Sequence, residues 1–161
     1  ETFRSGELGF LGYVDMDRVA YYRVPEKRHT TNSEFDLSMS AELPRVEILY
    51  SYADTSNALL VRALLEAGIQ GIVIACTGAG TLSSAEKEAV SHAVSQAGPA
   101  KPVFVRSTRV GNGRVLGRKE YDELGMVPAD NLSPQKARIL LMLALTKTRD
   151  LREINRMFSE Y

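Results

Sequence analysis

The sequence predicts an α/β domain, a three-layer parallel sheet flanked by helices, and three observations carry the prediction. Short apolar runs at 46–50, 71–76 and 102–106 alternate with helical patterns. Such alternation requires right-handed crossover connections, which make the strands parallel. The central run 71–76 is apolar throughout and rich in β-branched residues, as expected for a strand buried on both faces.

Helical patterns fill the intervals between these strands and continue to the end of the chain. Their starts carry recognisable signals: a capping box in which Glu lies three residues after Ser, a Ser-Pro pair, and an Asp cap. The expected helices are 55–67, 83–97 with the box Ser83–Glu86, one from Ser133-Pro134, and a last one capped by Asp150. Between the third strand and the Ser-Pro pair, residues 107–132 show no regular period.

The first third of the chain has a different organisation. Residues 11–23 predict a β-hairpin with a short polar turn at 15–17. Two strands cannot bury a core alone, so the hairpin belongs to a larger sheet or packs on the following domain. Three regions follow from this: 1–30 with the hairpin, a linker over 31–44 that mixes Ser and Pro without period, and the α/β domain over 45–161.

The charge balance argues against two classes of partner, nucleic acid and membrane. Lys plus Arg and Asp plus Glu both number 20, so there is no overall field to attract polyanions. The basic stretch 106–119 lacks interleaved aromatic residues and is interpreted as a solvated loop. No apolar run approaches the roughly 20 residues of a membrane span. The chain begins with neither Met nor a signal peptide, which predicts a processed or truncated product.

The joint after the central strand is the best candidate for a small-molecule site. Gly78 and Gly80 in the segment 77–81 permit positive φ and close approach of a ligand to the backbone. Open α/β sheets bind ligands beyond the carboxyl ends of their strands, where both 77–81 and the long segment 107–132 begin. The plainer alternative is that the glycines only make the turn. The segment matches neither nucleotide-binding glycine pattern, so a nucleotide is not expected there. We expect no cofactor and no metal for this chain.

An ordered succession of short motifs runs through the whole chain. The motifs are Phe3-Arg4-Ser5 with Leu11-Gly12, Tyr21-Tyr22-Arg23, His29-Thr30-Thr31-x-Ser33-x-Phe35-Asp36, Leu43-Pro44-x-Val46-x-Ile48-Leu49-Tyr50, Gly71-Ile72-Val73, Gly78-Ala79-Gly80, Arg106-Ser107-Thr108-Arg109-x-Gly111-x-Gly113 and Leu132-Ser133-Pro134-x-Lys136-Ala137-Arg138-x-Leu140-Leu141. With these motifs the sequence resembles the C-terminal part of bacterial type II L-asparaginases and glutaminase-asparaginases.

That resemblance implies a homo-oligomer, dimer or tetramer, that hydrolyses L-asparagine, and often L-glutamine, to the acid and ammonia. The threonine nucleophile and its Thr-Lys-Asp arrangement belong to the family's N-terminal domain, so none of this chain's residues is expected to be catalytic. Residues 1–30 then form the end of that N-terminal domain. The isolated chain is expected to be inactive. Type II relatives are typically exported, which implies a periplasmic location.

The resemblance implies two positions that bind substrate in a neighbouring subunit's site, and three residues of this chain are candidates for them. Family members carry Asn or Ser after the Gly-x-Gly, and Thr81 stands there in this chain. An acidic residue of the long loop binds the substrate's α-amino group, and Glu120 is the best match, with Glu123 second. The alternative is that Glu120 is an ordinary exposed acid. The motif at 106–109 is interpreted as structural.

Two rival functions follow from the residues. A free-standing α/β binding or interaction module could have kept the fold without the chemistry, although its hairpin would then expose strand edges. A complete enzyme could use Cys76 or Thr77 as nucleophile, but no base lies near either in the sequence. Cys76, the single cysteine, ends an apolar strand and is more simply a small buried hydrophobe.

Overall fold

The computed structural model describes residues 4–6, 8–36, 42–96, 98 and 101–161. Its contacts divide the chain into two units, residues 1–33 and residues 34–161, which are described separately. The family motif residue Phe3, the end of the predicted helix at residue 97 and part of the predicted linker, 37–41, lie outside the described residues. Among the described residues, no helix is long and apolar enough to cross a membrane.

The first unit contains the predicted β-hairpin. Strands β1 (Gly12–Asp15) and β2 (Arg18–Tyr21) pair in antiparallel fashion, with Asp15 opposite Arg18 across the turn. Met16 in that turn has a φ of 53°, which matches the twist of two-residue hairpin turns. The hairpin's burial pattern shows no core of its own, as expected of two strands.

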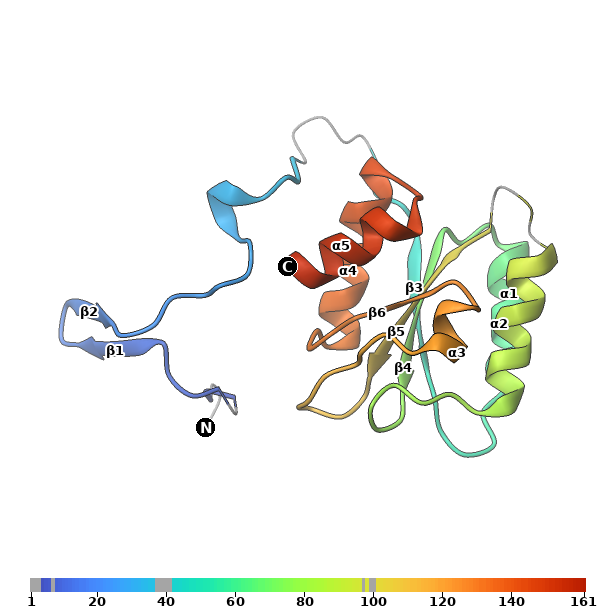
Figure 1. Ribbon diagram of the computed structural model, residues 1–161, viewed down its shortest axis with the longest axis horizontal. Coiled ribbons are helices and arrows are strands. Elements are labelled where there is room, and N and C mark those ends of the chain that lie inside the picture. The colour runs from blue at the N-terminus through green and yellow to red at the C-terminus, as the bar shows by residue number, and fades with distance from the viewer. Residues whose placement is uncertain (1–3, 7, 37–41, 97, 99–100) are drawn as a thin grey trace. The chain divides into compact units, whose positions relative to one another are not determined.

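The second unit is built on a four-stranded parallel sheet in the order β3-β4-β5-β6 (Figure 1). The strands are β3 (Val46–Tyr50), β4 (Gly71–Cys76), β5 (Val103–Thr108) and β6 (Met126–Pro128). The three predicted strands are confirmed, with β5 extending two residues beyond its predicted end. The sheet order follows the chain order, so every crossover joins neighbouring strands.

Helices cover both faces of this sheet (Figure 1). The helices are α1 (Asn57–Glu66), α2 (Ser84–Gln96), α3 (Lys119–Asp122), α4 (Pro134–Lys147) and α5 (Leu151–Glu160). Helices α4 and α5 pack on one face, while α1, α2 and the short α3 pack on the other. The predicted three-layer α/β architecture is therefore confirmed.

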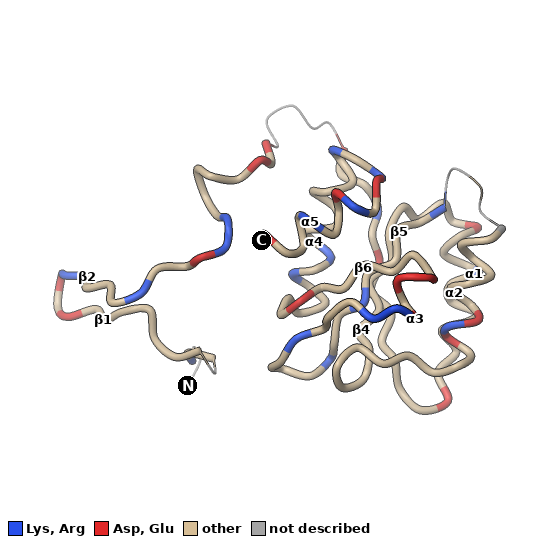
Figure 2. The backbone as a smooth tube through the Cα atoms, in the orientation of Figure 1, with Lys and Arg blue, Asp and Glu red and all other residues tan. Residues whose placement is uncertain are grey.

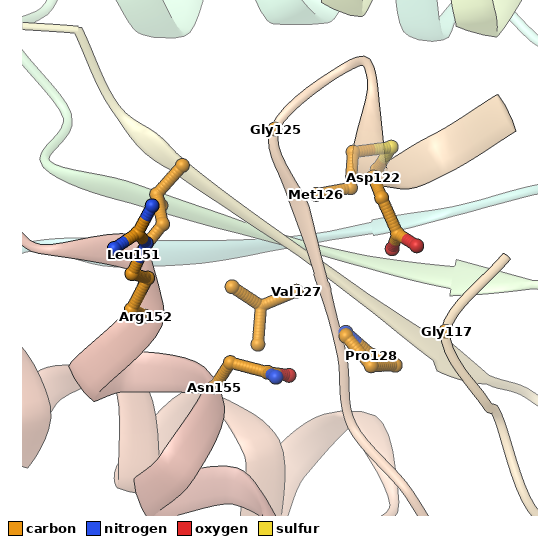
Figure 3. Close-up of a pocket in the computed structure, with 9 residues that line it drawn as sticks. All are labelled: Gly117, Asp122, Gly125, Met126, Val127, Pro128, Leu151, Arg152 and Asn155. Carbon is orange, nitrogen blue, oxygen red and sulfur yellow. The ribbon is translucent and has the colours of Figure 1, made fainter. Parts of the chain in front are cut away.

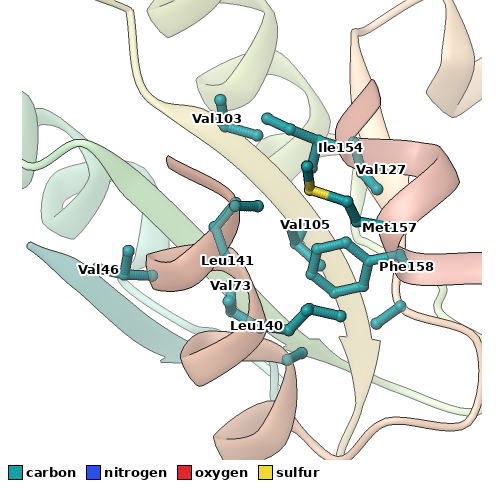
Figure 4. Packing of buried hydrophobic residues seen from close by; sticks show 13 residues of the cluster. Val46, Val73, Val103, Val105, Val127, Leu140, Leu141, Ile154, Met157 and Phe158 are labelled. Carbon is teal, nitrogen blue, oxygen red and sulfur yellow. The ribbon is translucent and has the colours of Figure 1, made fainter. Parts of the chain in front are cut away.

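Each face of the sheet has its own hydrophobic core. On the α4–α5 face, valines of the strands meet Leu141, Ile154 and Phe158 of the helices (Figure 4). On the other face, Ile72 and Ile74 of β4 meet the residues of α1 and α2 that point inward. Because β4 contributes to both cores, all its side chains are buried, as its unbroken apolar sequence predicts.

The segment 107–132 is not irregular throughout, contrary to the expectation from its sequence. It contains the single turn α3 and the fourth strand β6, which pairs with β5 through Phe104↔Met126 to Arg106↔Pro128. Three residues are too short a run to show a strand period, and Pro128 argues locally against a strand. Pro128 is tolerated because β6 lies at the edge of the sheet, where one side of the strand needs no partner.

Part of the predicted linker is attached to the second unit. Phe35 packs against the Tyr161 ring at 5.0 Å between centroids, and the Glu34 N–H donates to the Tyr161 hydroxyl at 2.7 Å. The Glu34 carboxylate also accepts from the Arg156 guanidinium at 2.9 Å. The unit boundary thus lies at residues 33 and 34, and a linker over 31–44 stays a prediction for the remaining residues.

Replacing Tyr161 with Phe is expected to lower the unfolding free energy of the domain by about 1 kcal/mol. The ring contact with Phe35 stays, while the acceptor for the Glu34 N–H and a weak donor to the Glu34 carboxylate, at 3.4 Å, are lost. Urea denaturation of the two chains at pH 7 measures the difference. Tyr22→Phe on the exposed hairpin is the control, and an equal effect of both substitutions would contradict the role given to this hydrogen bond.

Candidate functional site

Two loops meet at the carboxyl edge of the sheet, as the sequence predicts. The segment 77–81 follows β4, and the segment beginning at Arg109 follows β5. Thr108 ties them together, since its hydroxyl donates to the Gly78 carbonyl at 2.6 Å. The Arg109 N–H also donates to the Cys76 carbonyl at 3.0 Å. The loops are therefore parts of one hydrogen-bonded edge.

Thr81 closes the first loop and leaves its side chain exposed. The Thr81 N–H donates to the Thr77 carbonyl at 2.9 Å, and the Thr77 hydroxyl donates to the Thr81 carbonyl at 3.1 Å. These bonds engage the backbone of Thr81. The Thr81 hydroxyl therefore lies on a loop whose two ends, Thr77 and Thr81, are hydrogen-bonded to each other.

Arg106 of β5 makes hydrogen bonds to both segments at this edge. Its side chain is fully buried, and Nη1 donates to the Gly80 carbonyl at 2.7 Å. Nη2 donates to the Leu116 carbonyl at 2.7 Å, and the guanidinium stacks on the Tyr121 ring at 3.8 Å from its centroid. Burial lowers the pKa of Arg106, but an arginine stays charged at neutral pH. The sequence motif identified this residue as structural without revealing its partners.

The acidic candidates lie on and beside α3, directly after two basic residues (Figure 2). The Glu120 carboxylate pairs with Lys87 Nζ of α2 at 2.5 Å, and this hydrogen bond lowers the pKa of Glu120. Glu123 pairs with Lys119 at 3.9 Å, and both of these side chains are mostly exposed. Of the two acids, Glu120 has the shorter ion pair and the closer tie to α2.

Thr81 and Glu120 are the two leading candidates, and their neighbours in the sequence are hydrogen-bonded to each other. Tyr121, next to Glu120, is buried, and its hydroxyl accepts from the N–H of Leu82, next to Thr81, at 3.2 Å. The loop that carries Thr81 and the turn that carries Glu120 therefore lie against each other at the same sheet edge. Glu123 lies one turn further on, beyond the contact with Leu82.

A buried carboxylate supports the start of α2 just behind this edge. Glu86 accepts from the Ser83 N–H at 2.9 Å, while Ser83 Oγ accepts from the Glu86 N–H at 3.3 Å, which confirms the predicted capping box. Ser51 and Asn57 also donate to this carboxylate, at 2.9 and 2.6 Å. Burial alone would raise the pKa of Glu86, but the hydrogen bonds outweigh it and the pKa is lowered. The capping pattern reveals only the Ser83 half of this network.

The glutaminase/asparaginase C-terminal domain family matches this chain over residues 45–158. The chain belongs to that family. The match covers the four-stranded sheet and its helices up to residue 158 of α5, so the expected family is confirmed for the α/β domain.

Individual asparaginases match the chain over its full length. It is 40% identical over 161 residues to L-asparaginase 2 of Bacillus subtilis, covering 100% of this chain and 41% of that relative. It is 39% identical to the probable periplasmic L-asparaginase of Haemophilus influenzae, covering 100% of this chain and 45% of that protein. The chain thus spans less than half the length of these relatives and corresponds to their C-terminal part.

A solved asparaginase has the same fold. The crystal structure of the probable cytoplasmic L-asparaginase from Campylobacter jejuni superposes with a TM-score of 0.88 at 40% identity, covering 96% of this chain and 49% of that one. Asparaginase relatives of this chain thus include proteins named as periplasmic and as cytoplasmic. In these relatives, the sequence of this domain is part of a larger polypeptide.

The surroundings of Cys76 and Thr77 in this asparaginase C-terminal domain argue against either residue as a nucleophile. Burial raises the pKa of the Cys76 thiol to about 12, so the reactive thiolate is scarce at neutral pH. The Thr77 hydroxyl donates to a backbone carbonyl rather than to a base. Within the described residues, no group of three or more His, Cys, Asp or Glu side chains could hold a metal ion.

A pocket of about 330 Å³ lies beside the edge strand β6 (Figure 3). Asp122 of α3 and Arg152 and Asn155 of α5 supply its polar lining, and Met126 and Val127 supply apolar surface. None of Thr81, Glu120 and Glu123 lines it. The three candidate binding residues of this asparaginase domain therefore lie outside this pocket.

Proposed function

We propose that this chain is the C-terminal half of an L-asparaginase-type amidohydrolase and forms the wall of a substrate site that a second domain completes. The hydrogen bond from Leu82 to Tyr121 supports this most directly, because it joins the loop of Thr81 to the turn of Glu120. L-asparagine is the proposed substrate, with L-glutamine as the larger alternative. The nucleophile is proposed to lie in the asparaginase N-terminal domain.

The chemistry of the two side chains suits an amino-acid substrate. A carboxylate such as Glu120 complements an α-ammonium group, which offers hydrogen-bond donors only. The Lys87 ammonium already illustrates such a contact, because its Nζ lies 2.5 Å from the Glu120 carboxylate. The Thr81 hydroxyl can both donate and accept, so it suits the polar side chain or carboxylate of the substrate. Glu123 is the second candidate for the acidic role.

The proposed partners follow from the same arrangement. The domain organisation proposed for the chain is the end of the N-terminal domain over 1–30, a linker over 31–44 and the C-terminal domain over 45–161. Thr81 and Glu120 are proposed to face the site of a neighbouring subunit, in a dimer or tetramer. The proposed location is the periplasm, as in the Haemophilus influenzae relative's name.

A hybrid enzyme tests this function. The chain replaces the matching C-terminal part of Bacillus subtilis L-asparaginase 2, and ammonia release from L-asparagine and L-glutamine is measured. The isolated chain is expected to release no ammonia, and the folded hybrid is expected to release it. Turnover by the isolated chain would refute the proposal, as would a folded, oligomeric hybrid without activity.

Replacing Glu120 with Gln in the hybrid is expected to raise the KM for L-asparagine by about tenfold or more, because a charge-assisted hydrogen bond is lost. The nucleophile is elsewhere, so kcat should change much less. Glu123→Gln is the matched control on the same turn, and its effect on KM should be small. If Glu123→Gln raises KM and Glu120→Gln does not, the acidic role belongs to Glu123.

A free-standing binding module is the second candidate, since residues 34–161 close two hydrophobic cores within one unit. Size-exclusion chromatography and calorimetric titration of the chain with L-aspartate distinguish the two functions. A stable monomer that binds L-aspartate with micromolar affinity would favour the module. An isolated chain without such affinity would favour the asparaginase half.

A further inference from the structure

Arg106 makes contacts on both sides of the proposed binding edge. Its side chain lies at 0% exposure on β5, between the loop that follows β4 and the segment that follows β5 itself. Nη1 donates to the Gly80 carbonyl and Nη2 to the Leu116 carbonyl, both at 2.7 Å. One planar guanidinium therefore fixes the relative position of two loops that are 26 and 10 residues away in sequence.

Tyr121 extends this connection to α3. The guanidinium carbon of Arg106 lies 3.8 Å from the Tyr121 ring centroid, a distance typical of a stacked cation–π contact. The Tyr121 hydroxyl accepts from the Leu82 N–H at 3.2 Å. Gly80 and Leu82, the residues on either side of Thr81, are thus held by the Arg106–Tyr121 pair. Glu120 precedes Tyr121 directly.

The loop comes so close to Arg106 that only glycine fits at position 80. A Cβ built on Gly80 would lie 2.9 Å from Arg106 Nη1 and 2.5 Å from Val115 Cγ1. Gly80 has a φ of +86°, in the region that favours glycine. The absence of a side chain at Gly80 therefore allows the Arg106 guanidinium to pack directly against this loop.

Arg106 is not the simplest way to fill this space. Its Nε is buried and has no hydrogen-bond partner among the described residues. An unpartnered buried N–H group is costly, and an apolar side chain of similar volume would avoid that cost. The contacts of the two terminal nitrogens and the guanidinium plane are what an apolar side chain could not supply.

We propose that Arg106 is a positioning residue that holds Thr81 and Glu120 in a single arrangement for substrate binding, a role that rests on the proposed asparaginase function. It acts through Gly80, Leu116 and Tyr121 and touches no substrate. Thr81 and Glu120 then move as one unit, because the same guanidinium holds the loop of the first and the turn of the second.

Hydrogen exchange on the 161-residue chain tests the coupling without any substrate. In Arg106→Met, amide exchange is expected to rise by about tenfold or more in both 78–83 and 114–124, while α4 and α5 keep their protection. Arg138→Met is the matched control, because Arg138 donates to the Val46 carbonyl at 2.7 Å, at the opposite end of the sheet. Faster exchange in only one of the two segments would overturn the coupling.

Two milder variants keep the test decisive if Arg106→Met unfolds the domain. Arg106→Lys keeps the charge but loses the planar fork. Tyr121→Phe keeps the ring and removes the hydroxyl, which accepts from the Leu82 N–H and also interacts with Lys87. Arg106→Lys should speed exchange in both segments, and Tyr121→Phe mainly in 78–83. If Arg106→Lys exposes α4 and α5 as much as the two segments, Arg106 has only a general structural role.

The hybrid enzyme tests the link to substrate. Arg106→Lys is expected to raise the KM for L-asparagine by about tenfold with kcat within about threefold, since it displaces binding groups and not the nucleophile. A fall in kcat at unchanged KM would overturn the positioning role. Absence of ammonia release from the unmutated hybrid would instead refute the proposed function, and the exchange experiment would still decide the coupling.

Discussion

Replacing Glu86 with Ala is expected to lower the unfolding free energy of the domain by about 3 kcal/mol at pH 7, as measured by urea denaturation. The carboxylate accepts hydrogen bonds from Ser51, Asn57 and Ser83 and is 2% exposed. Removing it leaves several polar donors without their acceptor in a place that water hardly reaches. Glu88→Ala, an exposed position on the same helix, is the control and should change stability by less than about 0.5 kcal/mol.

The stability difference between the native chain and Glu86→Ala is also expected to depend on pH. The folded pKa of Glu86 lies below the ordinary glutamate value of 4.5, which we take for the unfolded chain. Its ionised form therefore stabilises the fold fully above that value, and this contribution is lost as the pH falls through the folded pKa. The stability difference between the native chain and Glu86→Ala should narrow between pH 7 and pH 3. A constant or widening difference would show that the ionised carboxylate is not what stabilises this region.

Replacing Gly80 with Ala is expected to destabilise the domain by about 2–4 kcal/mol, through steric overlap and backbone strain together. The added methyl would lie 2.5 Å from Val115 Cγ1 and 2.9 Å from Arg106 Nη1 at a φ of +86°. Relief requires the loop to move away from Arg106. The hydrogen bond from Arg106 to the Gly80 carbonyl would then lengthen or break.

Gly78 in the same loop is the matched control for this substitution. Its φ is +50°, and a Cβ there would meet no atom within 4 Å. Gly78→Ala should therefore cost only the backbone strain, about 1 kcal/mol. Urea denaturation of both variants measures the difference. Equal losses for Gly78→Ala and Gly80→Ala would show that packing against Arg106 and Val115 adds nothing.

Local signals in the sequence predicted the elements of this fold well. The alternation of apolar runs with helical patterns predicted three of the four strands of the parallel sheet, together with their parallel direction. The caps Ser133 and Asp150 accept from backbone N–H groups as expected. Helix α1 begins at Asn57, two residues later than predicted, and the Asn57 side chain is bonded to Glu86 and the Tyr50 carbonyl. A local pattern cannot show such a contact.

The sequence by itself determined the α/β class, the capping of the helices and, through its motifs, membership of the glutaminase/asparaginase family. Those features depend on residues a few positions apart. Only the tertiary structure decided that three residues form the edge strand β6 and that Arg106 reaches Gly80, Leu116 and Tyr121. The carboxylate of Glu86 likewise meets Ser51 across 35 residues of chain. Such contacts arise when sheet formation brings distant segments together, so no short stretch of sequence encodes them.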